Sequence, residues 1–581
     1  MKKVLFMAVL GLVMNFSSKA QITYSSDNGA GDTLFTVSGT LVGTGTGLYK
    51  NLYFKKNHQY LLTGYVFVDS LTTLNIAAGT VIKGDKPTKG TLIIKRGAKL
   101  KALGTNTDPV IFTSNQPIGS RAAGDWGGVV ICGRATNNLG TNVQLEGNYG
   151  AFHGGTDDLD NSGTIKFVRI EFAGIALNPN QEINSLTMGS VGSGTIIHHV
   201  QVSYAGDDSY EWFGGTVNSR YLIAYNGVDD CFDTDNGYRG YNQWGIGLHN
   251  DPNIADVSKT NGFESDNNSG STAATPKTRA TFSNYAMYGP LFPGAAPANA
   301  NFQAGAHIRR NSEMGLYNSV LSYYPKGIII DGSTTIANAN GGLLNVENCA
   351  FVDNTTTYNE VGGSLLPTLA GFFTANADTA ITAAVAKFQN PYGIPPAARN
   401  FAVKFTSPLK TGASFADARV GIPAGPSGAG FSTSLTERGA AGNWAGNPTL
   451  TWFNYDPQNV NYNLGNWANY MPEADKGTEQ VDAATKSAEV TEVAVDFDQV
   501  AIYPNPADVR TMFSVEFEEG GAGVVTIIDM NGRAVATTGA VFQRGLNEFF
   551  YDSSVLENGL YKVSITNGGV VKTSTMLVSH Q

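Results

Sequence analysis

Residues 200–208 read VQVSYAGDD, and residues 222–230 read LIAYNGVDD. Each stretch is a short run with apolar residues at alternate positions, followed by a glycine-containing turn that ends in two aspartates. Alternation with a period of two is typical of a β-strand. The two stretches are offset by 22 residues, since 222 minus 200 is 22. A further step of 22 predicts that Leu222 lies beside Trp244, and Ala224 beside Ile246, in the next copy.

An upstream copy, residues 165–174 (IKFVRIEFAG), matches residues 197–206 at an offset of 32. Short strands at such offsets are typical of a parallel β-helix, in which each coil buries its apolar face by stacking on its neighbours. A β-propeller needs a period of roughly 40 residues, and a chain of sandwiches needs frequent hairpin turns. The sequence therefore predicts an all-β body over residues 21–471, with an Ala-rich helix or insertion at residues 378–388.

The amino-acid composition and net charge argue against some classes of function. Charged residues make up 15% of the chain and glycine contributes 69 of 581 residues, so the polar surface comes mainly from Asn, Thr, Ser and Gly. The net charge is -10 with no basic run, which argues against nucleic acid as a partner because phosphate binding needs clustered Lys and Arg. Cys132, Cys231 and Cys349 are widely spaced, and we expect them to be buried thiols rather than disulfide or metal ligands.

The N-terminus has the pattern of an export signal. Lys2 and Lys3 precede an apolar stretch, residues 4–13, that is too short to span a bilayer. Small residues at Ser18 and Ala20 then suit a cleavage site. We expect a signal peptide at residues 1–20 and a mature protein with no transmembrane segment.

The C-terminal part changes character twice. Residues 472–499 contain eight acidic and two basic residues, which predicts an extended, solvated linker. Residues 500–581 then contain about seven short alternating stretches, with a strong hairpin signal at Asn531-Gly532. This pattern predicts a small Ig-like β-sandwich.

The C-terminal segment resembles the sorting domain of type IX secretion substrates. The matching motifs are YPNPA at 503–507, D-x-N-G-R-x-V at 529–535, GLN at 545–547 and L-x-x-G-L-Y at 556–561. The resemblance implies that residues 500–581 engage the type IX secretion machinery. It also implies a Gram-negative source and a protein that is secreted or attached to the outer surface.

The body resembles a group of secreted bacterial proteins with right-handed parallel β-helix repeats and no defined activity. The matching motifs are ALGT at 102–105, PVIFT at 109–113 and GDWGG at 124–128, together with the turns at Asp207 and Asp229. The resemblance implies the fold, including its right hand, rather than a reaction.

The aspartate-rich turns are the main candidate for chemistry. Stacked on adjacent coils, they would place carboxylates roughly 4.8 Å apart, where they repel unless they are protonated, solvated or bridged by a cation. Oxygen-rich clusters suit Ca²⁺. The candidate calcium ligands are Asp207, Asp208, Asp229, Asp230 and Asp233. The simpler interpretation is that these aspartates only cap turns through hydrogen bonds to backbone.

The same aspartate-rich turns also allow a catalytic interpretation. Polygalacturonases are β-helical and place aspartates on successive coils, followed by a histidine and a basic residue. The order of Asp208, Asp229, Asp230 and His249, with Arg309 or Arg310 after them, is similar. The flanking residues depart from that pattern, because Ala205-Gly206 precedes the first pair and His249 lacks a following glycine.

Two further sequence patterns, a dense group of aromatic residues and a pair of adjacent histidines, lead to structural predictions. Aromatic residues are dense between residues 204 and 244 and predict either sugar-stacking platforms or core ladders. They are Tyr204, Tyr210, Trp212, Tyr225, Tyr238, Tyr241 and Trp244. His198 and His199 are adjacent on a strand, so we expect them to point to opposite faces and not to share a metal ion.

The sequence thus predicts a secreted or surface-displayed β-helix with a sorting sandwich. The leading functional hypothesis is a binding or adhesion protein for extracellular polymers such as glycans, because a solenoid offers a long binding face. The alternative is a polysaccharide hydrolase or lyase that uses aspartates on adjacent coils.

Overall fold

The computed structural model describes fourteen stretches of the chain. They are residues 21–27, 33–44, 49–56, 58–178, 181–394, 399–422, 430–440, 452–462, 500–503, 507, 510–517, 519–530, 533–543 and 545–579. The predicted signal peptide (1–20), the acidic linker (472–499) and the Asn531-Gly532 turn lie outside the described residues.

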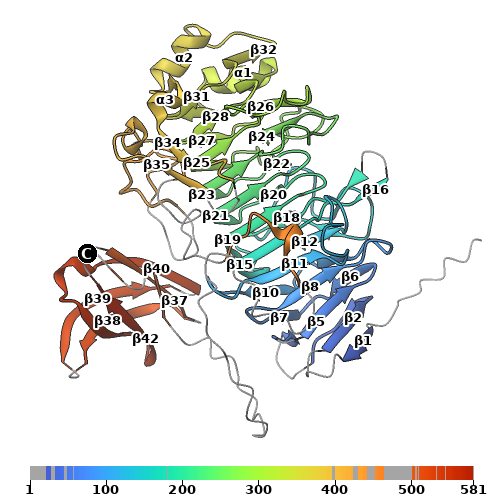
Figure 1. Cartoon of the computed structure of the whole chain (residues 1–581), viewed down its shortest axis with the longest axis vertical. Coiled ribbons are helices and arrows are strands. Elements are labelled where there is room, and N and C mark those ends of the chain that lie inside the picture. The colour runs from blue at the N-terminus through green and yellow to red at the C-terminus, as the bar shows by residue number, and fades with distance from the viewer. Residues whose placement is uncertain are drawn as a thin grey trace, which may run out of the picture.

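The body is a parallel β-helix whose strands stack along the long axis of the molecule (Figure 1). One wall is an 11-stranded sheet in which every neighbouring pair is parallel. Its strands in spatial order are β3 (Thr40–Leu41), β6 (Tyr65–Val68), β9 (Thr91–Ile94), β12 (Gly128–Cys132), β18 (Leu186–Val191), β20 (Tyr210–Gly215), β22 (Phe232–Asp235), β24 (Thr260–Ser265), β26 (Phe302–Ile308), β29 (Lys326–Asp331) and β32 (Thr356–Val361).

An 18-stranded sheet forms the rest of each coil. Its strands are β1 (Gln21–Asp27), β2 (Thr33–Ser38), β4 (Lys50–Phe54), β5 (His58–Leu62), β7 (Thr72–Ile76), β8 (Val81–Gly84), β10 (Lys99–Leu103), β11 (Val110–Ser114), β15 (Gly163–Glu171), β19 (Ile196–Ser203), β21 (Asn218–Tyr225), β23 (Tyr241–Leu248), β25 (Thr281–Tyr288), β27 (Gly315–Tyr317), β28 (Val320–Ser322), β30 (Asn345–Glu347), β31 (Ala350–Val352) and β33 (Thr379–Ile381). Only β1 is antiparallel to its neighbour among these described strands, and it pairs with β2 at one end of the stack.

The larger sheet turns a corner in the middle of its longest strands. A left-handed residue interrupts each of five successive strands, with φ between 50° and 64°. These residues are Phe167, His199, Tyr221, Trp244 and Asn284. Positive φ is uncommon for residues other than glycine, so its repetition at equivalent positions marks a corner shared by the coils. The rings of Phe167, His199, Tyr221 and Trp244 stack in turn, with centroids 4.3–4.6 Å apart.

The repeat predicted from the sequence is confirmed with one correction. Ile165 pairs with Ile197, and Val200 pairs with Leu222. Leu222 then pairs with Gly245, not Trp244, and Ala224 pairs with Gly247, not Ile246. The next coil is one residue longer, and its inward-facing glycines leave room for larger neighbours. A Cβ on Gly245 would lie 1.9 Å from the Tyr285 ring, and one on Gly247 would lie 2.1 Å from Met287 Cε.

The interior between the walls is filled by one large hydrophobic cluster. Tyr210, Trp212 and Tyr238 lie fully inside it. The Tyr210 and Phe232 rings stack with centroids 5.3 Å apart, and those of Trp212 and Tyr238 are 5.2 Å apart. Cys132, Cys231 and Cys349 are buried free thiols, as expected.

Short hairpins and helices are inserted between the strands of the coils. They are the hairpins β13 (Val143–Gln144) with β14 (Phe152–His153), β16 (Ala176–Asn178) with β17 (Gln181–Glu182), and β34 (Phe388–Asn390) with β35 (Asn400–Val403), and the helices α1 (Ser333–Asn340), α2 (Leu369–Ala375) and α3 (Ala383–Ala386). The Ala-rich stretch 378–388 thus combines β33, α3 and the start of β34. The helices gather at the end of the stack opposite β1 (Figure 1). There Phe373 of α2 packs against Phe351 and Tyr358 and covers the end of the core.

We call the described residues 399–422, 430–440 and 452–462 the strap, and they lie in turn along the outer face of the 18-stranded sheet. Their contacts pass step by step toward the N-terminal coils. The hydrogen bonds are Ser414 N to Asn318 Oδ1, Ser432 N to Gln243 Oε1, Asn454 N to Gln201 Oε1, Arg121 Nη1 to the Pro457 carbonyl and Gln59 Nε2 to the Tyr462 carbonyl. The end of the strap lies on β8 and β11, where Tyr462 packs against Val81 and Ile111. The strap therefore connects the last coils of the body to the first.

The C-terminal segment forms a separate β-sandwich, as the sequence predicts. One sheet contains β36 (Ala501–Tyr503), β37 (Arg510–Phe517) and β40 (Gly545–Asp552). The other contains β39 (Ala534–Phe542), β38 (Gly521–Asp529), β41 (Gly559–Asn567) and β42 (Val570–Val578). Phe513 and Val515 from the first sheet meet Ile527, Val563 and other residues of the second in a common core. In the described part of the chain, no helix has the length and apolar character needed to cross a membrane.

Candidate functional site

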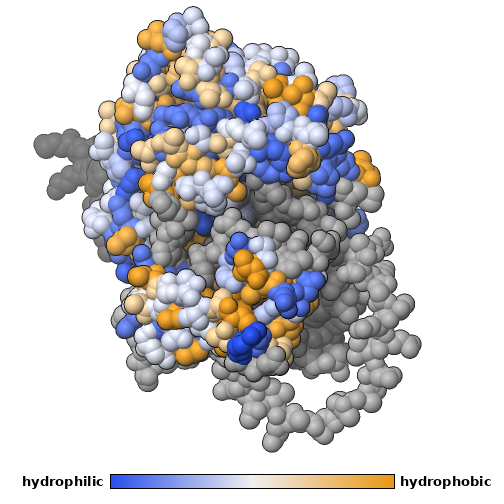
Figure 2. Space-filling model, turned by 90° about the vertical axis from the view of Figure 1, so that its left-hand side faces the viewer, coloured by the Kyte–Doolittle hydropathy of each residue, from blue (hydrophilic) through white to orange (hydrophobic). Residues whose placement is uncertain are grey.

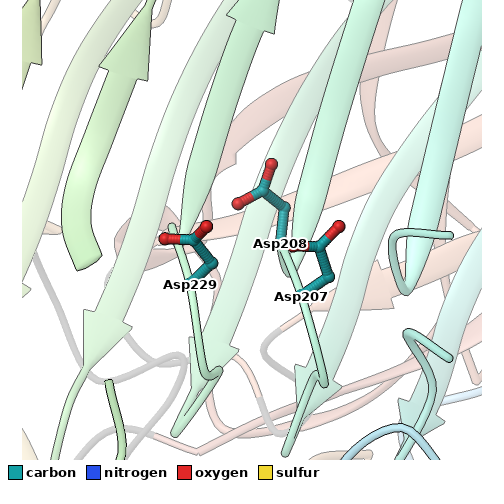
Figure 3. A group of neighbouring side chains, drawn as sticks. All are labelled: Asp207, Asp208 and Asp229. Atoms are coloured by element: carbon teal, nitrogen blue, oxygen red, sulfur yellow. The ribbon is translucent and has the colours of Figure 1, made fainter. Parts of the chain in front are cut away.

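The two aspartate-rich turns lie side by side on adjacent coils, each leading into the 11-stranded sheet. Asp207 and Asp208 precede β20, and Asp229 precedes β22. Figure 3 shows the three side chains grouped on these turns, with the two members of the first pair next to each other. Strands β20 and β22 pair in parallel with Tyr210 opposite Phe232, which sets the two turns in register.

A glycine contact holds the first turn close to the coil before it. A Cβ on Gly206 would lie 2.5 Å from the Gly174 carbonyl oxygen and 2.7 Å from Gly124 Cα. Both obstacles are backbone, so only glycine fits this position without moving a coil. Because Gly206 is the residue immediately before Asp207, this packing determines where the acidic turn begins.

Two trios of carboxylates come together here. The oxygens of Asp207, Asp208 and Asp229 lie within 4.8 Å of one another, and so do those of Asp208, Glu211 and Asp233. Glu211 and Asp233 are paired residues on β20 and β22. We call these five residues the acidic cluster. The predicted stacking of aspartates on neighbouring coils is present, and Glu211 joins it.

The acidic cluster is short of compensating groups. Oδ1 of Asp229 and Oδ1 of Asp233 are buried and have no hydrogen-bond partner. No residue of the cluster forms an ion pair with another described residue, since the nearby Arg309 is paired with Glu264 and Asp266. Buried polar atoms are normally satisfied, so these two carboxylate oxygens on adjacent coils are positions at which a proton, a water molecule or a cation would bind.

The electrostatics agree with this geometry. Burial, followed by the charge of neighbouring carboxylates, holds the pKa values of Asp207, Asp208 and Glu211 well above their usual range. Burial, with a further contribution from Asp256, raises the pKa of Asp229 to about 7. Burial and the charge of Asp266 raise the pKa of Asp233 to about 7 as well. The cluster therefore favours protons or cations at neutral pH.

Asp230 and Asp208 also have a structural role. Asp208 Oδ1 accepts a hydrogen bond of 2.9 Å from the backbone N–H of Asp230, and Asp230 Oδ1 accepts one from the backbone N–H of Asn261. Each carboxylate thus ties its coil to the next. This agrees with the turn-capping interpretation, except that the backbone N–H group that each aspartate binds belongs to the following coil and not to its own turn. Asp230 is in neither carboxylate trio.

His249 does not share a face with the acidic cluster. It is 1% exposed, and its ring contacts two core residues. Its Nδ1 lies 3.1 Å from the Tyr324 hydroxyl, and its Nε2 lies 3.7 Å from Cys231 Sγ. Burial lowers the pKa of His249 to about 4, so the ring is neutral at physiological pH. The residue after β23 thus turns into the solenoid interior, and the His249 ring lies next to the chain of the Asp229 turn rather than among its carboxylates. The catalytic role of Asp208, Asp229, Asp230 and His249 stays a prediction.

Arg309 and Arg310 lie on the same wall as the acidic cluster, two coils further on. Arg309 Nε is 3.0 Å from Asp266 Oδ1, and Arg310 Nη1 is 2.5 Å from Asp266 Oδ2. Arg309 also pairs with Glu264 on β24. These ion pairs leave a second acidic patch largely compensated, in contrast to the cluster beside it.

Sequence reasoning missed the residues that border the acidic cluster. Glu146 and Glu182, from the two hairpin insertions, contribute to the raised pKa of Asp207. Asn184, which is 4% exposed, donates a hydrogen bond from Nδ2 to Glu211 Oε2. The insertions vary in length and carry no repeat, so only the fold brings them here. The pairing of Glu211 with Asp233 could be predicted from the sequence, because the two residues are separated by the same 22-residue offset that aligned the turns.

The dense aromatic residues are not free sugar platforms. Tyr210, Trp212 and Tyr238 are core residues, and Tyr225 and Trp244 are buried in a cluster that includes Trp452 and Tyr455 of the strap. Tyr241 packs against Phe431 of the strap, with ring centroids 5.6 Å apart. Tyr204 is partly buried against the same strap cluster.

The expectation that His198 and His199 point to opposite faces is wrong. The φ of His199 is 55°, and this left-handed backbone cancels the alternation of the strand. The two Nδ1 atoms lie 2.8 Å apart. Burial holds the pKa of both rings well below the usual range, and no metal-ligating group of three residues includes them among the described residues.

Comparisons with known proteins agree with this fold. Residues 46–390, more than half of the chain, match the family described as pectate-lyase-like β-helix domain. Residues 501–579 match the secretion system C-terminal sorting domain, which implies the type IX secretion machinery and indicates a secreted or outer-surface protein. A search of curated proteins finds no match.

Among solved structures, the chain is similar to the Dettilon tailspike protein at 12% identity and a TM-score of 0.20. The match covers 54% of this chain and 62% of the tailspike chain, which is less than two thirds of its length. From its sheet architecture and the family match, the chain belongs to the family of proteins with a pectate-lyase-like β-helix domain, and it carries a C-terminal sorting domain after that body.

Proposed function

We propose that this secreted β-helix protein binds an extracellular polymer, such as a glycan, on the outer face of the 11-stranded sheet and that calcium bound by the acidic cluster assists. The observation that carries the proposal is the acidic cluster itself, with two buried, unpartnered carboxylate oxygens on adjacent coils. Such oxygens suit Ca²⁺, which takes six to eight oxygen ligands. Hydroxyl or carboxylate oxygens of a sugar can replace the water ligands that complete such a shell.

The shape of the body supports a polymer rather than a small molecule. Parallel strands continue on both sides of the acidic cluster, so the wall offers equivalent positions at successive coils. The carboxylates that are not bound to a cation are hydrogen-bond acceptors for sugar hydroxyls. On the molecular face shown in Figure 2, the hydrophobic residues of the described part lie in small separate groups. The described residues on that face therefore form no large apolar surface of the kind used by hydrophobic partners.

The binding test uses the purified protein and a panel of immobilised acidic and neutral polysaccharides, in Ca²⁺ or in EDTA. We expect binding of at least one polymer in Ca²⁺ and a loss of that binding in EDTA and in the double variant Asp229→Asn, Asp233→Asn. The matched control is Asp251→Asn, since Asp251 lies outside both trios. Equal binding by the double variant, or no binding across the panel, would contradict the proposal.

A second candidate is a polysaccharide hydrolase or lyase. The observation that favours it is the pair of carboxyls, Asp229 and Asp233, whose pKa values near 7 suit proton transfer at neutral pH. Within each trio, however, the oxygens lie within 4.8 Å, which is closer than the roughly 6.5–9.5 Å between the two carboxyls of an inverting hydrolase. Incubation of the bound polymers with the protein, followed by measurement of new reducing ends and unsaturated products, separates a catalyst from a binding protein.

The sorting domain gives this function a location. We propose that residues 500–581 direct the body through the outer membrane of a Gram-negative cell, after which the body is displayed at the surface or released. Fractionation of cells that express the full chain, compared with a variant truncated after residue 499, tests this step. Retention of the truncated variant in the periplasm is the expected result, and its normal appearance outside the cell would refute the assignment.

A further inference from the structure

We propose that the acidic linker, residues 472–499, docks on a lysine-bearing surface of the first coils of the β-helix. The surface belongs to the 18-stranded sheet and is formed by β10 and by β15 up to its corner residue. We call it the basic face, and its charged residues are Lys99, Lys101 and Lys166. It lies on a different sheet from the acidic cluster, so this proposal does not depend on the proposed function.

The first coils have the opposite charge to the rest of the chain. Residues 49–121 contain eleven Lys or Arg residues and three Asp or Glu residues, a net charge of +8, since 11 minus 3 is 8. The whole chain has a net charge of -10, so the remaining residues carry -18. The basic residues are spread along the sequence, and the stacking of the coils gathers them on one part of the body. A surface of this sign attracts acidic segments of the same chain.

Lys99 and Lys101 face outward because the residues that follow each of them enter the core. Leu100 and Ala102 are buried in the large hydrophobic cluster, and successive side chains of a strand point to opposite faces. Lys99 and Lys101 are only partly buried. The Nζ atom of Lys99 lies 4.4 Å from the centre of the Tyr49 ring, so an aromatic ring supports the ammonium group at the surface.

Lys166 extends the basic face to the next coil. Leu103 of β10 pairs with Lys166 of β15, and Lys101 pairs with Thr164, so the lysines lie on neighbouring strands about 4.8 Å apart. Among the described strands around them, β4, β7 and β10 contain no Asp or Glu, nor do the parts of β15, β19 and β21 that precede their corner residues. These strands therefore carry no carboxylate that would repel an acidic segment.

The three acidic residues of the first coils are engaged elsewhere. Asp69 pairs with Lys95 at 2.5 Å, and Asp108 pairs with Lys56 at 3.0 Å. Asp85 accepts hydrogen bonds from the backbone N–H and the hydroxyl of the threonine three residues later. None of the three belongs to a strand of the basic face. They therefore do not balance its positive charge.

The strap brings the linker to the same coils. Tyr462, the last described residue of the strap, packs against Val81 of β8 and Ile111 of β11. Strands β8 and β11 follow β7 and β10 in the same coils, so Tyr462 is one corner away from the basic face. Nine residues, 463–471, separate Tyr462 from the linker, and an extended stretch of nine residues spans about 30 Å. The first acidic residues of the linker are therefore within reach of the basic face.

The spacing of charges in the linker matches that of the basic face. The linker has eight acidic and two basic residues, a net charge of -6, since 8 minus 2 is 6. Glu473 and Asp475 are two residues apart, as are Lys99 and Lys101. Residues two apart in an extended chain lie about 7 Å from each other on the same side, so the two carboxylates can contact the two ammonium groups together. Each contact is weak, but the tether holds the linker near the face at a high effective concentration.

Zero-length cross-linking of the full chain with a carbodiimide tests the proposal, because it joins a lysine to a carboxylate only where the two are in contact. We expect linker carboxylates joined to Lys99, Lys101 or Lys166 at low ionic strength, and loss of these products in about 1 M NaCl, where charges are screened within about 3 Å. A mixture of isotope-labelled and unlabelled chains should give no product that joins two copies. Linker carboxylates joined only to other lysines, or to a second copy, would overturn the proposal, and so would the absence of any link between linker and body.

Trypsin cleavage at Lys476 and Lys486, the two basic residues of the linker, provides an independent readout. A test variant reverses the charge of the basic face, and a control variant makes the same change in net charge on other surfaces. The test substitutions are Lys99→Glu, Lys101→Glu and Lys166→Glu, and the control substitutions are Lys326→Glu, Lys404→Glu and Lys562→Glu. At low salt we expect linker cleavage to be about tenfold faster in the test variant than in wild type, because several surface charge contacts are lost together, and unchanged in the control. Circular dichroism verifies that both variants are folded.

An anionic polymer is the competing occupant of the basic face. Equal cleavage in all three proteins, with heparin bound by wild type and control but not by the test variant, would assign the face to such a polymer and overturn the linker proposal. Faster cleavage in the test variant, with cross-links at the basic face, supports the linker proposal whether or not heparin binds. Calcium-dependent polymer binding is measured with substitutions on the other sheet, so the two proposals fail separately.

Discussion

The acidic cluster should make the metal-free protein less stable as the pH rises from 4 to 8. A carboxyl whose pKa is raised in the folded state binds its proton more tightly there than in the unfolded chain. By linkage, stability falls between the unfolded and folded pKa values and is constant above both. For Asp229 and for Asp233, this window extends from 3.8 to about 7.

The magnitude follows from the size of the shift. The difference between 3.8 and about 7 is roughly three pKa units, and each unit corresponds to about 1.4 kcal/mol. One such carboxyl therefore destabilises the folded state by about 4 kcal/mol at pH 8 relative to pH 4. The two residues belong to one coupled cluster, so their effects are not additive, and about 4 kcal/mol is the expected change for the pair as an order of magnitude.

The assay is urea unfolding followed by tryptophan fluorescence at several pH values, in EDTA and in excess Ca²⁺. Other groups titrate over the same range, so the informative quantity is the difference between wild type and the double variant Asp229→Asn, Asp233→Asn. In EDTA this difference should change by a few kcal/mol between pH 4 and 8. Calcium should restore wild-type stability at pH 8 and have little effect at pH 4, where protons compete for the same oxygens. Parallel pH profiles for the two proteins would refute the reasoning.

Three more predictions follow from single contacts. Gly206→Ala should destabilise the protein by roughly 2–4 kcal/mol, because its Cβ would meet the Gly174 carbonyl oxygen; a large fall in the thermal midpoint tests this, and a fall within experimental error would contradict it. His249→Gln should leave calcium and polymer binding unchanged while it lowers stability by about 1–3 kcal/mol, since the ring lies in the core; loss of binding by a folded variant would return His249 to the site. Tyr462→Phe should cost about 1–3 kcal/mol by removing the hydroxyl that donates to buried Glu171, and hydrogen exchange should increase first in the N-terminal coils.

The sequence predicted the stacking of coils where the repeat was regular. The offsets of 22 and 32 place Val200 beside Leu222 and Ile165 beside Ile197, as the structure does. The register then failed at Trp244, because one additional residue enters the coil and Gly245 takes the inward position. A shift of one residue reverses the face of every side chain in a strand, and nothing local in the sequence signals it.

Predictions about individual side chains depended on backbone geometry that the alternation rule does not contain. His199 is at a left-handed corner, so it lies beside His198 instead of opposite to it. His249 follows a strand end that turns inward. The acidic turns could be predicted from the sequence because Asp207 and Asp229 repeat at the same offset as the strands. Asn184 and the insertion residues could not be predicted, because only long-range folding brings them to the acidic cluster.

The strap changes how a solenoid of this kind comes apart. A stack of coils held only by nearest neighbours can fray from either end, one coil at a time. Here Tyr462 bonds to Glu171, and Arg121 bonds to the Pro457 carbonyl, so the last-made part of the body is fastened to its first-made part. The N-terminal coils therefore reach full stability only after the ribosome has released about 460 residues. A chain cut short before Pro457 lacks both contacts, so we expect proteases to attack its N-terminal coils more readily than those of the full chain.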